Sequence, residues 1–322
     1  MKRVKIIGAG QLGSRHLQAL KAIPEDLAIS VVDPSSESLR VAKERYEAVT
    51  SGTTHPIEYE HELKAGGTWD LVIVATNANV RRPVVEQLLA TSEIRNLVLE
   101  KILFPDARDY EAVTRLVTVK GTKAWVNCCM RQMDIYSKIR ERVRGRPVHM
   151  SVTGSRFGLV TNAIHYFDYL AWITGSTMFT VDSLALQRQP VESKRKGYLE
   201  FNGTLSARFG DGSFGVVTCF EKGALPGFVE IHSTDARYLV RESERKAWVS
   251  EQANGWGWTE IEAPIPFQSQ LTAELARSIF ESGHCALPTL EESSSIHLQL
   301  LRPLAEHLRA QKQQFDLEFP FT

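Results

Sequence analysis

Residues 4–13 read Val-Lys-Ile-Ile-Gly-Ala-Gly-Gln-Leu-Gly, and residues 29–33, after an amphipathic run, read Ile-Ser-Val-Val-Asp. Gly8, Gly10 and Gly13 form a GxGxxG pattern directly after an apolar strand, and Asp33 ends a second apolar strand. In this pattern the first glycine allows a tight turn, the second lets a pyrophosphate approach, and the third lets helix and strand pack closely. Strand, helix, second strand and acid together predict a dinucleotide-binding unit. The three glycines alone would also fit a turn in another α/β protein.

The same stretch predicts which dinucleotide binds. The N-terminus of the helix offers N–H groups and a positive dipole to the phosphates. Asp33 can accept hydrogen bonds from both hydroxyls of an adenosine ribose, whereas a 2′-phosphate would meet a like charge there. No arginine follows directly, because residues 34–36 are Pro, Ser and Ser. We therefore expect NAD as the cofactor, with NADP as the alternative.

Composition excludes several classes of protein. The chain has 322 residues, which suggests two domains, and it carries 38 basic and 38 acidic side chains. This balance argues against a nucleic-acid partner. No apolar run approaches the roughly 20 residues needed to span a bilayer, and the first residues enter a strand at once instead of forming a signal peptide. The four cysteines lack the spacing of metal ligands, so we expect no metal, reduced thiols and a cytoplasmic protein.

The first 125 residues alternate apolar strands with helical patterns. This alternation predicts an α/β fold with a doubly wound parallel sheet, a Rossmann domain, over residues 1–125. The expected strands are Val4–Ile7, Ala28–Val32, Leu71–Ala75, Leu97–Leu99 and Ala124–Val126, with a shorter candidate at Ala48–Val49. The expected helices are Gly13–Ala22, Ser36–Tyr46, Arg82–Ala90 and Ala107–Val119.

Residues 126–322 show a different pattern, typical of an α+β domain with an open, mostly antiparallel sheet that would bind the substrate. A hairpin turn is expected at residues 210–212, Gly-Asp-Gly. The expected strands are Val148–Phe157, Thr180–Gln189, Leu199–Phe209, Ser213–Phe220, Phe228–Ser233 and Tyr238–Glu242. The expected helices are Thr161–Ile173, Gln268–Glu281 and Leu290–Gln311.

Three segments carry candidate chemistry. Glu100 and Lys101 end a buried strand where parallel sheets bind ligands, so Lys101 could stabilise negative charge on a substrate oxygen. Glu100 could contact the cofactor ribose or hold the lysine; a solvated loop pair is the alternative.

The second segment is residues 161–168, Thr-Asn-Ala-Ile-His-Tyr-Phe-Asp, which opens a helix. Helical spacing places Thr161, His165, Asp168 and Trp172 on one face. A histidine among polar residues can act as a general base, although a structural histidine is the alternative. In the third segment, Asn127 and Arg131 could bind substrate hydroxyls or a carboxylate, or serve the fold.

The chain resembles the glucose–fructose oxidoreductase, inositol dehydrogenase and MocA group over essentially all of its length. The resemblance rests on residues 8–13 (Gly-Ala-Gly-Gln-Leu-Gly), residues 74–77 (Val-Ala-Thr-Asn), Glu100-Lys101 and the spacing Asn162-x-x-His165-x-x-Asp168. It implies a Rossmann domain, an open-sheet domain and NAD(P)-dependent oxidation of sugar or cyclitol hydroxyls, or reduction of the ketones. Some similar sub-branches act in surface-carbohydrate biosynthesis.

The resemblance also implies roles for individual residues. The lysine and histidine of these motifs are the usual catalytic pair, with Thr161, Asn162 or Asp168 orienting His165. Cofactor contacts would come from Gly8, Gly10, Gln11, Leu12, Gly13, Asp33, Thr76, Asn77, Glu100 and Lys101. Substrate contacts would come from Asn127, Arg131, Arg156 and Asp168.

The chain departs from the usual motifs in three places. Ile102 stands where proline usually follows Glu-Lys, Asn77 stands in place of the middle proline of Thr-Pro-Asn, and Thr161 replaces an aspartate four residues before the histidine. Without that aspartate, His165 should be a weaker base. We expect an NAD(P)-dependent oxidoreductase acting on a sugar-like molecule, in a homo-oligomer (dimer or tetramer). The alternatives are an NAD(H)- and sugar-binding protein with reduced catalysis, and an NAD-dependent glycosidase or isomerase that uses transient oxidation.

Overall fold

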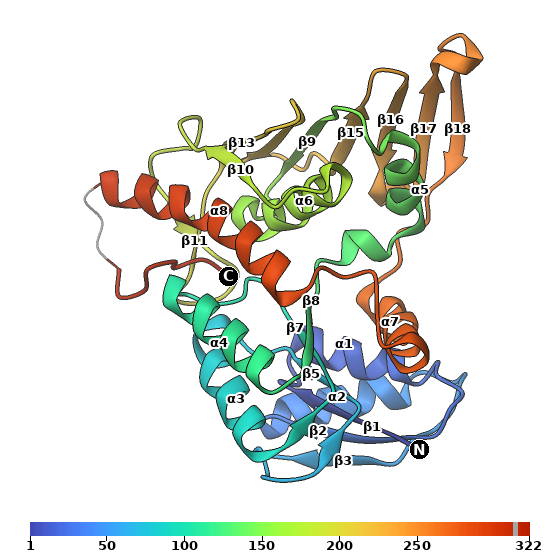
Figure 1. Ribbon diagram of the computed structural model, residues 1–322, viewed down its shortest axis with the longest axis vertical. Coiled ribbons are helices and arrows are strands. Elements are labelled where there is room, and N and C mark those ends of the chain that lie inside the picture. The colour runs from blue at the N-terminus through green and yellow to red at the C-terminus, as the bar shows by residue number, and fades with distance from the viewer. Residues whose placement is uncertain (312–314) are drawn as a thin grey trace. The chain divides into compact units, whose positions relative to one another are not determined.

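The computed structural model describes residues 1–311 and 315–322, and it divides them into two compact units (Figure 1). One unit comprises Met1–Asn127 and Pro266–Glu291, and the other comprises Cys128–Ile265 and Glu292–Thr322. This differs from the expected division at residue 125, because a segment from the second half of the chain returns to the first unit.

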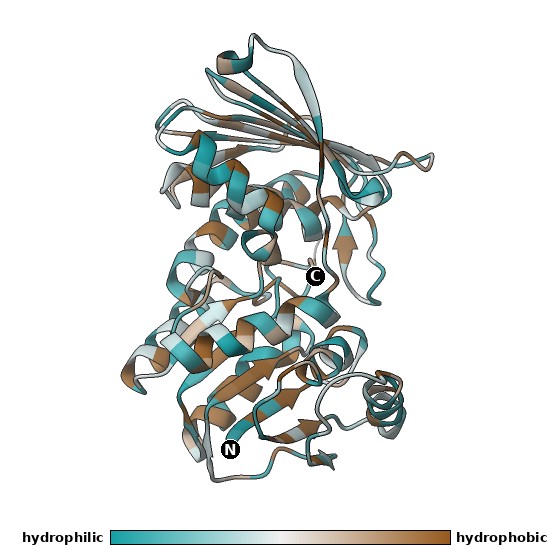
Figure 2. Cartoon of the chain, turned by 90° about the vertical axis from the view of Figure 1, so that its right-hand side faces the viewer, coloured by the Kyte–Doolittle hydropathy of each residue, from teal (hydrophilic) through white to brown (hydrophobic). Residues whose placement is uncertain are grey.

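The first unit contains the predicted parallel sheet of six strands. The strand order is β3-β2-β1-β5-β7-β8, the doubly wound order that reverses at β1. Its strands are β1 (Lys2–Ile7), β2 (Leu27–Val32), β3 (Ile57–Glu60), β5 (Leu71–Val74), β7 (Asn96–Leu99) and β8 (Lys123–Val126). A separate two-stranded sheet pairs β4 (Thr68–Trp69) with β6 (Glu93–Ile94). Figure 2 shows the apolar character of the main strands, and all four residues of β5 are buried.

Helices cover both faces of this sheet. They are α1 (Gln11–Leu20), α2 (Ser36–Glu47), α3 (Ala78–Thr91), α4 (Ala107–Val119) and α7 (Gln268–Ser282). Leu17 of α1 and Ile279 of α7 share one buried cluster with Ile6 and Val31 of the central strands. The returning helix α7 therefore completes the hydrophobic core of the first unit.

One expected strand of this unit is wrong. Ala48 ends helix α2 with a helical backbone instead of forming a strand with Val49. The third strand is β3, where Ile57 and Tyr59 pack against the core. Its alternation of apolar residues with Glu58 and Glu60 is the signal that the apolar-run criterion missed.

The second unit contains an eight-stranded sheet in the order β10-β13-β14-β9-β15-β16-β17-β18. Only β9 and β14 are parallel, so the sheet is mostly antiparallel, as predicted. Its strands are β9 (His149–Ser155), β10 (Phe179–Asp182), β13 (Gly203–Phe209), β14 (Phe214–Phe220), β15 (Phe228–His232), β16 (Ala236–Arg241), β17 (Lys246–Glu251) and β18 (Trp258–Glu262). A second pair joins β11 (Val191–Glu192) to β12 (Leu199–Glu200).

Helices α5 (Asp134–Val143) and α6 (Leu159–Thr174) contact this sheet, and α8 (Leu290–Ala310) is the last helix. Short 3-10 turns lie at Cys129–Gln132, Glu242–Glu244 and Gln252–Asn254. Every second residue of β14, β15 and β16 is buried, which agrees with the alternation seen in the sequence. No helix in the described part of the chain combines the length and apolarity that crossing a membrane requires.

Several boundaries in this unit differ from the sequence prediction. The strand expected at Thr180–Gln189 ends at Asp182, and the one expected at Leu199–Phe209 is broken before Gly203, which has a φ of +108°. The hairpin of β17 and β18 was not predicted, because β18 is largely exposed and its charged residues hide the alternation. Helix α5 was also missed.

Candidate active site

The glycine-rich turn joins β1 to α1 and lies beside the end of β2. The Gly8 amide donates to the Val32 carbonyl at 2.8 Å, and the Ala9 amide donates to Asp33 Oδ2 at 2.7 Å. Asp33 Oδ1 accepts from the Ser35 amide at 2.9 Å. These bonds fix the carboxylate next to the turn, where the sequence predicted that it would meet a ribose.

The three glycines differ in what a side chain would meet. A Cβ at Gly13 would lie 1.7 Å from the Gly8 carbonyl oxygen, and one at Gly8 would lie 2.9 Å from the Ala75 carbonyl carbon. A Cβ at Gly10 would have no neighbour within 4 Å. Gly8 and Gly13 are therefore required by packing, whereas Gly10 borders open space that a ligand can occupy.

Other features at this edge suit a dinucleotide. Helix α1 begins at Gln11 without a side-chain cap, so its first N–H groups remain available for an anion. Thr76 Oγ1, just after β5, is buried and has no hydrogen-bond partner among the described residues. Asn77 is exposed at the start of α3, and Leu12 is half-buried in the first turn of α1. The expected cofactor residues thus lie on adjoining strand ends of one sheet edge and fit the group.

Glu100 and Lys101 follow β7 at this same edge. Glu100 is 3% exposed, and its Oε1 accepts hydrogen bonds from His16 Nε2 at 2.9 Å and Asn127 Nδ2 at 2.6 Å. Burial opposes ionisation of Glu100, but the hydrogen bond and charge of His16, together with Asn127 and Lys101, lower its pKa to about 2. Lys101 is half-buried, and the peptide that joins it to Ile102 is cis. Glu100 is therefore an ionised anchor for its neighbours, which favours the expectation that it holds the lysine segment.

Asn127 was expected to contact substrate. It is 3% exposed, and its Nδ2 also donates to Gln268 Oε1 at 2.8 Å. Both hydrogens of the amide are therefore directed to other side chains of the first unit. This geometry favours a supporting role for Asn127.

In the second unit, the start of helix α6 is held by a carboxylate that the sequence analysis did not single out. Glu200, at the end of β12, accepts hydrogen bonds from the Val160 amide at 2.8 Å and the Thr161 amide at 3.1 Å. Thr161 Oγ1 donates to Glu200 Oε1 at 2.5 Å, and Asn162 Nδ2 donates to the Phe157 carbonyl at 2.7 Å. A carboxylate thus lies beside Thr161, contributed by a residue 39 positions later in the chain.

His165 lies in the second turn of α6, and its side chain is half-buried. Thr161, Asn162 and Tyr166 are also half-buried, so this part of the helix is accessible. Burial, followed by the charge of Glu242, raises the pKa of Tyr166. Tyr166 is therefore a neutral hydrogen-bonding group at neutral pH, and the expectation that His165 acts as the base stays a prediction.

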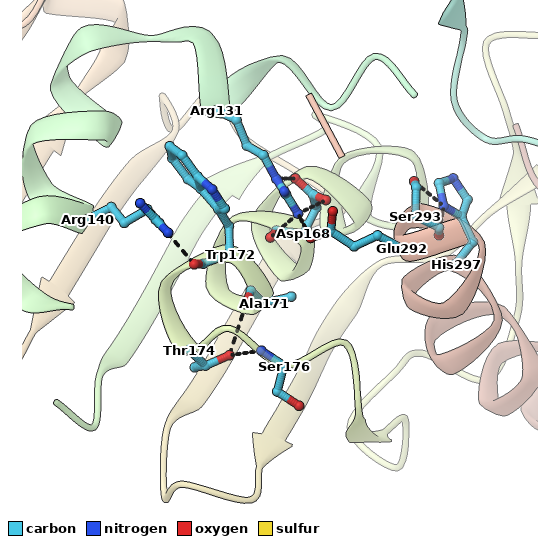
Figure 3. A network of polar contacts seen from close by, with 10 residues as sticks. All are labelled: Arg131, Arg140, Asp168, Ala171, Trp172, Thr174, Ser176, Glu292, Ser293 and His297. Atoms are coloured by element: carbon cyan, nitrogen blue, oxygen red, sulfur yellow. Dashed lines mark hydrogen bonds and ion pairs between the residues drawn. The ribbon is translucent and has the colours of Figure 1, made fainter. Parts of the chain in front are cut away.

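Arg131 and Asp168 pair with each other (Figure 3). Arg131 Nε and Nη2 donate to the two oxygens of Asp168, each at 2.8 Å, and Nη2 also donates to Glu292 Oε1 at 2.8 Å. Arg131 is 3% exposed and Asp168 is fully buried. Burial raises the pKa of Asp168, and the arginine opposes that shift. This arrangement favours a structural role for both residues and differs from the expected substrate contact.

Trp172 adjoins this pair, because the Arg131 guanidinium carbon lies 5.6 Å from the centroid of its ring. Trp172 packs against the guanidinium of Arg140, which lies 4.2 Å from the ring centroid, and its carbonyl accepts from Arg140 Nε. Asp168 faces the buried side of α6, whereas Thr161, His165 and Trp172 are half-buried, so the four residues do not share one accessible face. Arg156 is exposed just after β9 and has a φ of +55°.

Residues 2–128 match the GFO_IDH_MocA model, described as an oxidoreductase family with an NAD-binding Rossmann fold. No curated protein matches the chain. Solved structures match along almost the whole length at low sequence identity, so they show the fold.

Three of these structures are informative. An oxidoreductase from Agrobacterium radiobacter, in complex with NAD+, L-tartaric acid and magnesium, has 15% identity and a TM-score of 0.74 over 96% of each chain. The UDP-N-acetylglucosamine 3-dehydrogenase GnnA from Acidithiobacillus ferrooxidans has 14% identity and a TM-score of 0.70, over 97% of this chain and 99% of that one. A proposed myo-inositol dehydrogenase from Sinorhizobium meliloti 1021 has 14% identity and a TM-score of 0.67, over 98% and 99%.

Proposed function

We propose that the chain interconverts a hydroxyl and a ketone on a sugar, sugar derivative or cyclitol, because residues 2–128 match the GFO_IDH_MocA model of oxidoreductases with an NAD-binding Rossmann fold. The observation that carries this proposal is the turn at Gly8–Gly13, where Gly10 borders open space and Asp33 stands fixed at 2.7 Å from the Ala9 amide. The substrate class is inferred from UDP-N-acetylglucosamine and myo-inositol, which the names of two structural relatives contain.

The residues divide the chemistry between them. The turn and the start of α1 would hold the pyrophosphate, and Asp33 would accept hydrogen bonds from the adenosine ribose. Bound nicotinamide accepts or donates the hydride. Lys101 would donate a hydrogen bond to the reacting oxygen and stabilise charge that develops there. His165 would take the hydroxyl proton during oxidation and return it during reduction.

Supporting roles are proposed for four further groups. Thr161 and Asn162 would set the first turn of α6 and so the place of His165. Glu200 would hold that turn through its bonds to two backbone amides. The exposed Arg156 would contact the substrate. NAD is expected to bind more tightly than NADP, because a 2′-phosphate would meet the fixed carboxylate of Asp33.

A second candidate is a binding protein with reduced catalysis, which the absence of an aspartate at Thr161 favours. A third is a glycosidase or isomerase that oxidises its substrate only transiently. The test is a panel of sugars, nucleotide sugars and cyclitols, with their keto forms, assayed with both cofactors for NAD(H) absorbance and for product.

The three candidates give different results in that panel. Net change in NADH with one substrate supports the oxidoreductase, and its loss in His165→Asn supports the assigned base. Product formation without net NADH supports the third candidate. Tight NADH binding with no product from any compound supports the binding protein and contradicts the oxidoreductase.

We further propose a cytoplasmic homo-oligomer, a dimer or tetramer. All four cysteines are free, which is usual for a reducing compartment. The face of the antiparallel sheet that carries Phe228, Leu239, Trp248 and Trp258 forms an apolar hollow that a second copy of the chain could cover. Light scattering at several concentrations tests this: a monomer throughout would contradict it.

A further inference from the structure

Five side chains of the first unit form a closed ring of hydrogen bonds that the proposed chemistry does not use. They are His16, Glu100, Asn127, Gln268 and Thr272. His16 Nε2 lies 2.9 Å from Glu100 Oε1, which lies 2.6 Å from Asn127 Nδ2. The same Nδ2 lies 2.8 Å from Gln268 Oε1, Gln268 Nε2 lies 3.0 Å from Thr272 Oγ1, and that oxygen lies 2.8 Å from His16 Nδ1.

The available hydrogens allow one consistent assignment in which His16 donates twice. The Thr272 hydroxyl has one hydrogen, and the Gln268 carbonyl oxygen is an acceptor for it at 3.1 Å; with that bond made, Thr272 Oγ1 accepts from Gln268 Nε2 and from His16 Nδ1. Glu100 is an ionised acceptor, so His16 Nε2 donates to it. In this assignment both nitrogens of His16 donate; the alternative is an imidazole whose Nδ1 accepts from Thr272 Oγ1, and the experiment below distinguishes the two.

The ring connects elements that lie far apart in the sequence. His16 belongs to α1, Glu100 follows β7, Asn127 follows β8, and Gln268 and Thr272 belong to α7. His16 and Thr272 are fully buried, so water does not compete for these bonds. Lys101 is the next residue after Glu100, and the ring therefore fixes the backbone that carries it.

We propose that His16 is a positioning residue of the active site. It balances the negative charge of Glu100 inside the ring. The ammonium of Lys101 is therefore not drawn to Glu100 and stays directed to the substrate. The inference rests on the proposed function only in the role given to Lys101. Without His16, the carboxylate would draw the neighbouring ammonium toward itself. His16 lowers the pKa of Glu100 more strongly than Lys101 does.

The test measures the titration of Lys101 without any substrate. The full-length protein is treated with formaldehyde and cyanoborohydride across a series of pH values, and mass spectrometry follows methylation at Lys101, since only the neutral amine reacts. In His16→Gln, the uncompensated Glu100 should raise the midpoint by about one pH unit, a roughly tenfold slower reaction below the midpoint. In Glu100→Gln the midpoint should fall, because the nearby anion is gone.

Further variants separate this effect from loss of structure. Thr272→Val removes the acceptor of His16 Nδ1, so the midpoint should rise as in His16→Gln, and Thr272→Ser should restore the wild-type value. His55→Gln is the matched control, because His55 is also buried in this unit and its Nε2 lies 3.1 Å from the Leu20 carbonyl oxygen, outside the ring. Its midpoint should stay unchanged.

Opposite shifts in His16→Gln and Glu100→Gln support the proposal, because general loosening would move both variants in the same direction. An unchanged midpoint in folded His16→Gln and Thr272→Val would show a neutral His16 and overturn it. These results do not depend on whether a sugar is oxidised, so failure of the proposed function and failure of this inference are distinguishable.

Discussion

At the scale of single residues, Gly10 and Gly13 separate binding from folding. Gly10→Val should leave the fold intact, because a Cβ there meets no atom within 4 Å, yet abolish NADH binding by filling the space of the pyrophosphate. Gly13→Val should instead prevent folding, because its Cβ would lie 1.7 Å from the Gly8 carbonyl oxygen. Circular dichroism and calorimetric titration with NADH measure both effects. Unchanged affinity in folded Gly10→Val would remove the turn from the cofactor site.

A variant of Lys101 distinguishes a role in catalysis from a role in cofactor binding. Lys101→Ala should lower turnover by about 10²–10³, the usual effect of losing one donor to a developing oxyanion. The dissociation constant of NADH should change little, because the residue is assigned to the substrate oxygen. Steady-state kinetics with an active compound from the panel, beside NADH titration, give the answer. Lost NADH binding with full turnover at saturating cofactor would make Lys101 a cofactor ligand.

At the scale of secondary-structure elements, the start of α6 depends on Glu200. Thr161→Asp would restore the residue usual in similar proteins, but here it would set a carboxylate beside Glu200, whose Oε1 lies 2.5 Å from Thr161 Oγ1. The unfolding free energy should fall by about 1–3 kcal/mol near neutral pH, and the loss should shrink as the carboxylates are protonated. Thr161→Val, which only removes the hydroxyl donor, is the control in urea unfolding. Equal stability of Thr161→Asp and wild type would show that Glu200 moves away.

Glu100, just after β7, should make the unfolding free energy of the protein depend on pH. Its pKa of about 2 in the folded protein lies below the ordinary value of 4.5, so its contribution is present above pH 4.5 and disappears as the pH falls toward 2. Glu100→Gln should therefore be less stable than wild type by about 3 kcal/mol at pH 6, and the difference should vanish in acid. Urea unfolding at several pH values measures it. A difference that stays constant with pH would mean that Glu100 is not held ionised.

At the scale of the whole molecule, local patterns predicted most of the fold. Continuous apolar strands such as Leu71–Val74 and the glycine turn at Gly8 are local signals, so the first sheet and the turn that follows its first strand could be predicted from them. The alternation in Phe214–Phe220 likewise indicated the antiparallel sheet. Exposed strand β18 carries no such signal, because its residues face solvent at most positions.

Side-chain contacts between residues far apart in the sequence could not be predicted from the sequence. Arg131 and Asp168 are both polar residues in promising segments, but their 2.8 Å pairing, which satisfies them in the interior, appears only in three dimensions. Glu200 reaches the start of α6 from 40 residues away in the chain, and His16 reaches Glu100 across 84. Charge and polarity therefore identified candidate segments, whereas the contacts that each residue makes depend on elements distant in the sequence.

The returning helix α7 gives a prediction for the first unit as a whole. Its buried Leu275 and Ile279, together with Leu287 just after the helix, belong to the cluster that contains Leu17 of α1. Losing three such side chains, each worth about 1.5–3 kcal/mol, removes an amount comparable to the stability of a typical domain. A fragment of residues 1–127 should therefore not fold.

Adding the helix back should restore that unit. A chain that joins residues 1–127 to residues 266–291 through a short Gly-Ser linker should fold, because Asn127 and Gln268 lie in hydrogen-bond contact at 2.8 Å and the ends to be joined are close. It should also bind NADH, and NADH at 100 times its dissociation constant should stabilise it by about 2.7 kcal/mol. Thermal unfolding with and without NADH, with the Gly10→Val version as control, measures this gain. A folded, NADH-binding fragment of residues 1–127 alone would show that α7 is dispensable and that the expected boundary near residue 125 was sufficient.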